Sequence, residues 1–254
     1  MLEHQVEEAS LRAWPAFREE RLGPWLLRFG NGYTKRANSA TLTLAAKSMD
    51  PLSTVGACEE RYRAAGLRPC LRLPSFATPT RVDALLERNG YELLNGTEVL
   101  VLPLEAVSRS DGASVVSVDV DAWIAAFAAF SGSNRVETGK HKEVLAAIRQ
   151  PLIFAAIPHE GEIVSCGLGV HDSGLFGIVD IVTAPEHRRQ GHGRQLIQGM
   201  LNWAFAKGAR CAYLQVVEGN VPARRLYARL GFRDLHRYWY RAPADAGRRL
   251  SVET

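Results

Sequence analysis

The 254-residue chain has little cysteine, no long apolar run and little net charge. Its four cysteines are scattered without a C-x-x-C pair, so we expect buried thiols and neither disulfides nor a metal site. The longest apolar run, Ala122–Phe130, is far too short to span a bilayer. The first residues are acidic and have no apolar core, so we expect no signal peptide and a cytoplasmic location.

The formal net charge of +4 is mild. It suits an anionic ligand but is too small to argue for nucleic acid, which needs concentrated basic patches. The arginines and histidines between residues 187 and 194 keep nucleic-acid binding as one alternative, although no known nucleic-acid motif accompanies them. We therefore expect neither a nucleic-acid nor a membrane partner.

Residues 178–196 join three patterns in a row. Ile178–Thr183 is an apolar, β-branched run typical of a buried strand, and Pro185 stops the strand because proline has no N–H to donate. A basic turn with two glycines follows, and from Gln195 the apolar residues recur at helical spacing. One stripe of that helix carries Leu196, Ile197, Met200, Leu201 and Ala204.

A strand, a glycine turn and a helix start together favour an anion site. The first turn of a helix leaves N–H groups without partners, and the helix dipole adds partial positive charge there. Glycines let a ligand approach the backbone closely. The sequence lacks a Walker loop and the three-glycine dinucleotide fingerprint, so the pattern alone fits a phosphate cradle and an ordinary tight turn equally.

The spacing Arg188-x-x-Gly191-x-Gly193 resembles the acetyl-coenzyme A motif of the GNAT acetyltransferase superfamily. Residues 220–232 resemble the superfamily's last motif, Asn-x-x-Ala-x-x-Leu-Tyr-x-x-x-Gly-Phe. The strand-like run Cys211–Val217 lies between them, where the superfamily has its fifth strand. Two motifs in the right order and on the right elements make the resemblance specific.

The resemblance implies an α/β (α+β) fold in which helices flank a mixed central sheet. Because Leu85–Tyr91 parallels Leu226–Phe232, we expect the N-terminal part to be a partial or degenerate repeat of the same fold. We therefore expect a degenerate domain at 1–103, a linker at 104–115, an acetyltransferase domain at 116–242 and a flexible tail at 243–254.

Local patterns predict the elements of the C-terminal part. Apolar β-branched runs predict strands at 175–183 and 211–217. Asp121 is expected to cap an amphipathic helix, and a polar break at 131–139 is expected to separate it from a helix over His141–Gln150.

The resemblance also implies a set of contacts with the donor, acetyl-coenzyme A. The turn and the helix start would hold its pyrophosphate, the strand before them would pair with its pantetheine arm, and residues of the last motif would add further contacts. The implied cofactor-binding residues are Ile181, Val182, Thr183, Arg188, Arg189, Gln190, Gly191, His192, Gly193, Arg194, Asn220 and Tyr227.

Two residues are candidates for proton transfer. Tyr227 matches the superfamily's general acid, and a phenol with a pKa near 10 suits protonation of a thiolate. Asp180 is a carboxylate inside an otherwise apolar strand, where burial without a purpose is costly. It is the candidate general base, and pairing with a nearby cation is the open alternative.

The implied reaction is direct attack of a primary amine on the thioester of acetyl-coenzyme A in a ternary complex. Acceptors in the superfamily include small-molecule amines and protein N-termini or lysines, and homodimers are common there. The alternative is a non-catalytic sensor or interaction module that binds coenzyme A without transferring an acyl group.

Overall fold

The computed structural model describes residues 2–106 and 115–244. Its contacts gather the chain into two compact units. The first comprises Met1–Ala13, Leu100–Val216 and Asn220–Asp234, and the second comprises Trp14–Val99, Val217–Gly219 and Leu235–Thr254. The domain boundaries expected from the sequence stay a prediction, and most of the expected linker and tail lies outside the described residues.

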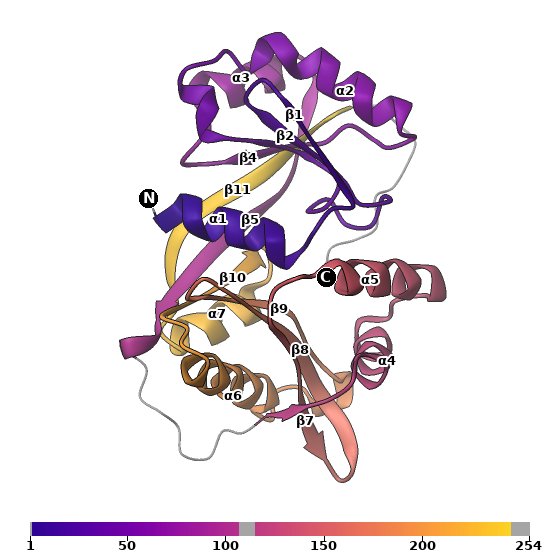
Figure 1. The fold of residues 1–254 in the computed structure, drawn as a ribbon, viewed down its shortest axis with the longest axis vertical. Coiled ribbons are helices and arrows are strands. Elements are labelled where there is room, and N and C mark those ends of the chain that lie inside the picture. The colour runs from indigo at the N-terminus through magenta and orange to yellow at the C-terminus, as the bar shows by residue number, and fades with distance from the viewer. Residues whose placement is uncertain (1, 107–114, 245–254) are drawn as a thin grey trace. The chain divides into compact units, whose positions relative to one another are not determined.

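The first unit holds most of the elements expected in the C-terminal part (Figure 1). Strands β5 (Tyr91–Pro103) and β11 (Arg233–Pro243) contribute residues to both units. The other elements of the first unit are α1 (Leu2–Ala13), β6 (Val116–Ser117), α4 (Val120–Ser131), α5 (Arg135–Ala147), β7 (Leu152–His159), β8 (Glu162–Asp172), β9 (Leu175–Thr183), α6 (His192–Ala206), β10 (Cys211–Val217) and α7 (Val221–Arg229).

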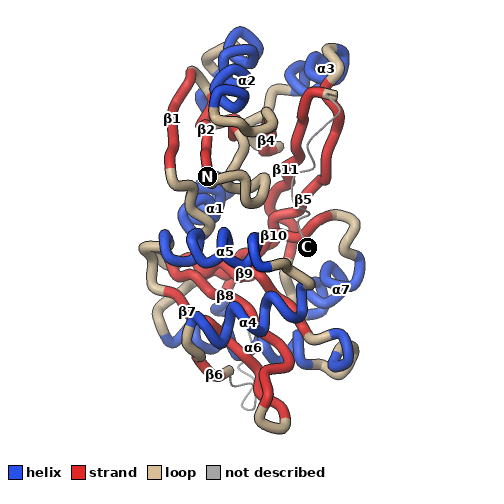
Figure 2. Tube along the Cα trace, turned by 90° about the vertical axis from the view of Figure 1, so that its right-hand side faces the viewer, coloured by secondary structure: helices blue, strands red, loops and turns tan. Residues whose placement is uncertain are grey.

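The sheet of the first unit is mixed. Its strands follow the order β10-β9-β8-β7-β6; β9 and β10 are parallel, and the other neighbours are antiparallel. Helix α6 packs against β7, β8 and β9, and α4 packs on the same strands from the opposite face (Figures 1 and 2). This arrangement confirms the predicted fold class, whereas the N-terminal repeat stays a prediction.

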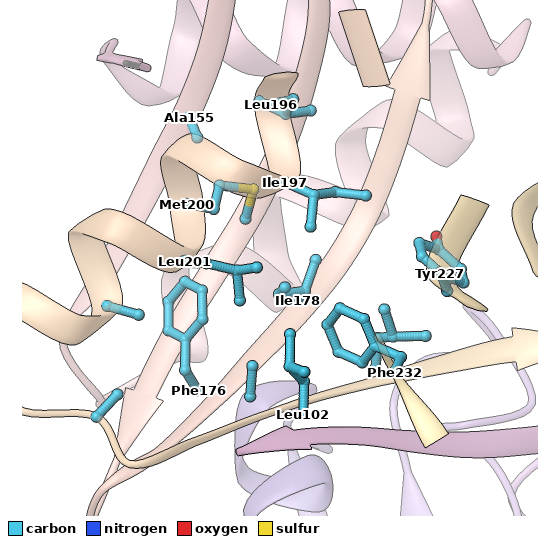
Figure 3. Close-up of a cluster of buried hydrophobic side chains, with 14 of the residues drawn as sticks. Leu102, Ala155, Phe176, Ile178, Leu196, Ile197, Met200, Leu201, Tyr227 and Phe232 are labelled. Atoms are coloured by element: carbon cyan, nitrogen blue, oxygen red, sulfur yellow. The ribbon is translucent and has the colours of Figure 1, made fainter. Parts of the chain in front are cut away.

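The core of this unit lies between α6 and the strands. All five residues of the stripe predicted for α6 are buried in one apolar cluster, which confirms the helical spacing. Figure 3 shows α6 side chains facing Phe176 and Ile178 of β9, with Tyr227 and Phe232 beside them. The core therefore fixes the start of α6 against the end of β9.

Three details differ from the sequence expectations. Helix α6 begins at His192, before the apolar stripe starts. Helix α4 is capped by Asp119, whose side chain accepts from the Ala122 N–H, so Asp121 is not the cap. Helix α5 begins at Arg135, inside the expected polar break, because Asn134 and Glu137 form a capping box.

The strands of the second unit follow the order β1-β2-β3-β4-β11, with a parallel pair between β3 and β4. Helices α2 and α3 contribute to its apolar core. Its remaining elements are β1 (Arg18–Leu22), β2 (Trp25–Phe29), β3 (Ala40–Leu42), α2 (Val55–Ala64), β4 (Leu71–Pro74) and α3 (Thr80–Arg88).

A side-chain amide holds the loop between β2 and β3. Asn38 accepts hydrogen bonds from the backbone N–H groups of Gly30 and Gly32 at 2.8 and 3.0 Å. Its amide nitrogen donates to the carbonyls of Tyr33 and Thr34, both at 2.8 Å. A buried amide that satisfies four backbone groups fixes this loop in one conformation.

Across residues 2–106 and 115–244, no helix combines the length and the apolar character needed to cross a membrane. The four cysteines are free thiols, as expected, and three of them are buried. Burial raises the pKa of Cys166 to about 12, with a further contribution from Asp180.

Candidate active site

The parallel strands β9 and β10 separate part-way along their length. Their ladder pairs Leu175–Ile178 with Cys211–Leu214 and extends no further within the described residues. Beyond Ile178, β9 stays paired with β8 on its other side up to Thr183. The backbone of Val179–Thr183 therefore has an edge that β10 does not cover, and an extended ligand could pair with it.

A β-bulge lies at the start of this uncovered edge. Cys166 of β8 pairs with Val182 and Leu168 pairs with Val179, so Gly167 faces two residues of β9, Asp180 and Ile181. A Cβ at Gly167 would collide with the Ile181 side chain, which explains the glycine. Asp180 has a φ of +53°, a left-handed conformation that aspartate adopts more readily than most residues.

The Asp180 carboxylate has a basic partner that sequence reasoning missed. The Nε2 atom of His141, on α5, lies 3.0 Å from Oδ2 of Asp180. The two residues are far apart in the chain, and His141 lies in an ordinary amphipathic segment, so no local pattern points to it. The contact gives the carboxylate a polar neighbour from α5, and the base role of Asp180 and its pairing with a cation both stay predictions.

The turn after β9 has the backbone that an anion cradle needs. Arg189 and Gly191 both have positive φ, +65° and +93°. Gly191 is the N-cap of α6, and no side chain caps the helix there. The first N–H groups of α6 therefore remain available to an anion, and the helix dipole favours one.

Gly193 brings three elements together. A Cβ at this position would lie 3.6 Å from both Thr183 Oγ1 and Leu226 Cδ2, so the end of β9, the first turn of α6 and helix α7 meet here. These are ordinary contacts, and the backbone at Gly193 does not have positive φ. The protein alone would thus accept a small side chain here, and a glycine additionally lets a ligand approach the backbone closely.

The basic side chains of the turn differ in their partners. Arg188 donates from Nε to the Thr183 carbonyl at 3.2 Å, and Gln190 donates to the Glu186 carbonyl at 3.1 Å. The Arg188 bond braces the turn against the end of β9, and the Gln190 bond lies within the turn. Arg189 and Arg194 are exposed, where they can meet anionic groups of a ligand.

Three histidine rings cluster beside the cradle. The His192 ring lies 5.7 Å from the ring of His159 and 5.9 Å from that of His187, and those two are 5.5 Å apart. Burial and the two neighbouring imidazoles hold the pKa of His192 below its usual range. Among the described residues, these histidines included, no group of three or more histidine, cysteine or acidic side chains could hold a metal ion.

The lowered pKa of His192 predicts how affinity for an anionic ligand depends on pH. His192 is neutral at pH 7.5, so His192→Gln should change the Kd of acetyl-coenzyme A there by less than about twofold. Acidification to pH 5.5 moves the solution toward the lowered pKa of His192, so the wild type should gain affinity over the variant there, by no more than about threefold, as for an exposed ion pair. Calorimetric titrations of both proteins at the two pH values measure this difference. A constant ratio between them would contradict it.

Tyr227 lies on α7 with 8% of its surface exposed, and its ring packs 6.0 Å from that of Phe232. Burial raises the pKa of Tyr227 to about 12. Its hydroxyl makes no hydrogen bond to any described residue. The phenol therefore stays protonated and available to donate across the physiological pH range.

Asn220 is the N-cap of α7, where its side chain accepts from the Ala223 N–H at 3.2 Å. This is a structural role, and the predicted contact with the cofactor stays a prediction. The structure thus brings the end of β9, the glycine turn and α7 together around Gly193, and it pairs Asp180 with His141. No described contact joins Asp180 to Tyr227.

The family described as "Probable histone acetyltransferase Rv0428c C-terminal" matches residues 4–241. The chain belongs to this family. Its sequence is 28% identical over 243 residues to the uncharacterized N-acetyltransferase YobR of Bacillus subtilis, covering 93% of this chain and 97% of that protein. It is 26% identical over 255 residues to the probable histone acetyltransferase Rv0428c of Mycobacterium tuberculosis, covering 95% of this chain and 74% of that protein.

The fold agrees with the family. A GCN5-related N-acetyltransferase from Kribbella flavida superposes with a TM-score of 0.71 at 19% identity, over 96% of each chain. As a member of the Rv0428c C-terminal family, the protein is an acetyltransferase of the GNAT superfamily. The resemblance found in the two sequence motifs is confirmed.

Proposed function

We propose that the protein moves the acetyl group of acetyl-coenzyme A to a primary amine by direct attack. The observation that supports this most is the opening between β9 and β10, which leads to the uncapped start of α6. An uncovered strand edge suits the amide groups of a pantetheine arm, and the helix start suits a pyrophosphate. A thioester donor supplies an activated acetyl group with a thiolate leaving group.

The cradle residues hold the donor in this proposal. Backbone N–H groups from Arg189 to Arg194 bind the pyrophosphate, with Arg188 and Gln190 bracing the turn. The main chain of Ile181, Val182 and Thr183 pairs with the pantetheine arm. Asn220 adds a contact from the start of α7.

Two side chains carry out the proton transfers in this proposal. The acceptor's ammonium group gives a proton to the Asp180 carboxylate, which frees the nitrogen lone pair to attack the thioester carbon, and the nitrogen loses its second proton to solvent after the attack. The new C–N bond forms as the C–S bond breaks. Tyr227 donates its hydroxyl proton to the departing thiolate and regains one from solvent, which its raised pKa allows at neutral pH.

The acceptor class is a primary amine carried by a protein lysine or N-terminus or by a small molecule. The name of the mycobacterial relative, a probable histone acetyltransferase, makes a lysine side chain the first acceptor to test. We place the enzyme in the cytoplasm and assign residues 1–103 to a degenerate copy that supports the catalytic domain at 116–242.

Two measurements on the purified protein test the proposal. Calorimetric titration with acetyl-coenzyme A and with desulfo-coenzyme A should give micromolar affinity for both. Thiol release from acetyl-coenzyme A should then accelerate when a histone-derived lysine peptide or a member of a panel of small primary amines is added. Binding without amine-dependent thiol release would indicate a coenzyme A sensor and not an enzyme. Absence of binding would show that the glycine turn does not hold coenzyme A.

A further inference from the structure

The second member of the His141–Asp180 pair has no part in the mechanism above. We propose that His141 is a positioning residue, which fixes the Asp180 carboxylate as the binding point for the ammonium group of a cationic acceptor. The inference rests on the proposed amine acetylation. It adds that the acceptor is positively charged and that His141 influences the affinity for it.

The first argument is burial. His141 is 1% exposed, and its Nε2 lies 3.0 Å from the Asp180 carboxylate. Its ring packs edge-to-face against Trp123 at 5.7 Å and Phe127 at 4.8 Å, both on α4. Aromatic rings on that side leave the imidazole little freedom to turn. The position of His141 is therefore set by α4 and α5, independently of any ligand.

The second argument is the state of Asp180. Its side chain is 14% exposed, so the carboxylate is held from the buried side by His141 and still reaches solvent. The bulge and the left-handed backbone place Asp180 outside the regular alternation of side chains along β9. A strained residue with a polar partner, at the start of an uncovered strand edge, is the pattern expected at a functional site.

The third argument concerns the other charged groups around the carboxylate. Cys166, on β8, stays a neutral thiol because its pKa is raised. Lys142, the residue after His141 on α5, is exposed and pairs with Asp121 at 2.7 Å. The Asp180 carboxylate thus faces solvent with an oxygen that can accept a hydrogen bond from an ammonium group.

A purely structural explanation makes a different prediction. If His141 only stabilised a buried carboxylate, its removal would lower folding stability and all kinetic constants together. A positioning role affects the acceptor first, because the acceptor's ammonium group contacts Asp180 whereas the pyrophosphate cradle lies at the far end of β9. The KM for the amine therefore distinguishes a positioning role of His141 from a purely structural one.

The test compares His141→Gln with wild type in thiol release, using the lysine peptide or amine that the wild type acetylates. We expect the KM for the amine to rise at least tenfold and kcat to fall by a smaller factor, because Asp180 is also the proposed base, with the Kd of acetyl-coenzyme A and the Tm unchanged. His236→Gln is the matched control. His236 is also buried and packs edge-to-face on an aromatic ring, that of Phe76 at 4.9 Å, but belongs to the second unit.

A spectroscopic readout accompanies the kinetics. The imidazole ¹⁵N signals of His141 should shift in Asp180→Asn, and those of His236 should not. Unchanged His141 signals, or an unchanged amine KM in His141→Gln, would overturn the positioning role while the proposed function stands. Equal losses in the His141 and His236 variants would overturn it too. A wild type that binds acetyl-coenzyme A but acetylates no amine would instead overturn the proposed function, and this inference with it.

Discussion

Gly193→Glu is expected to weaken acetyl-coenzyme A binding at least a hundredfold, or by about 3 kcal/mol. The new side chain would start from the first turn of α6, beside Thr183 and Leu226, and its length would carry it into the proposed pyrophosphate site. Its carboxylate would also place negative charge at a helix start that favours an anion. Calorimetric titration of the variant with acetyl-coenzyme A measures the loss.

Gly56→Glu is the matched control for this prediction. Gly56 also lies in a helix without positive φ and has open space around it, but α2 belongs to the second unit. This control should keep wild-type affinity. Because the contacts around Gly193 are loose, both variants should also keep a wild-type Tm within a few degrees. Retained binding in a folded Gly193→Glu protein would show that the glycine turn is not the cradle.

Tyr227→Phe is expected to lower kcat by about 10²–10⁴-fold while the Kd of acetyl-coenzyme A changes little. The substitution removes the proton donor for the thiolate and keeps the ring that packs against Phe232. Since the pKa of Tyr227 is raised to about 12, the wild-type kcat should show no fall from Tyr227 ionisation below about pH 11. Thiol release under saturating substrates, followed across pH, measures both effects.

Tyr213→Phe serves as the control for loss of a buried hydroxyl. Tyr213 is 2% exposed on β10 and pairs with Gly177, before β9 and β10 separate. It should retain most of the wild-type kcat. A loss below about threefold in Tyr227→Phe, or an equal loss in the two tyrosine variants, would remove Tyr227 as the general acid.

Local sequence chemistry predicts the elements of the first unit well. Strands β9 and β10 have the bounds expected, because apolar β-branched runs are interrupted by glycine or proline at both ends. The buried stripe of α6 follows from the same kind of pattern, whereas the anion cradle stays a prediction. Helix α5 begins earlier than expected, but a local pattern also marks its start, since Asn134 and Glu137 have the spacing of a capping box.

Other features depend on contacts that no local pattern encodes. The contact between His141 and Asp180 joins α5 to a bulge in β9, and the bulge itself depends on how β8 and β9 align. Strand β1 reads Arg-Glu-Glu-Arg-Leu, a charged run that forms a strand because it pairs with β2. In such cases tertiary contacts override local preference.

The chain passes between its two compact units at residues 13–14, 99–100, 216–217, 219–220 and 234–235. A single protease cut therefore cannot release either unit whole. A fragment that starts at residue 116 lacks Leu100, Leu102 and Leu104 of the first core, and one that ends at residue 99 lacks β11, the partner of β4. Recombination that exchanges one unit for a relative's would need several crossovers, so the two units are expected to be inherited together.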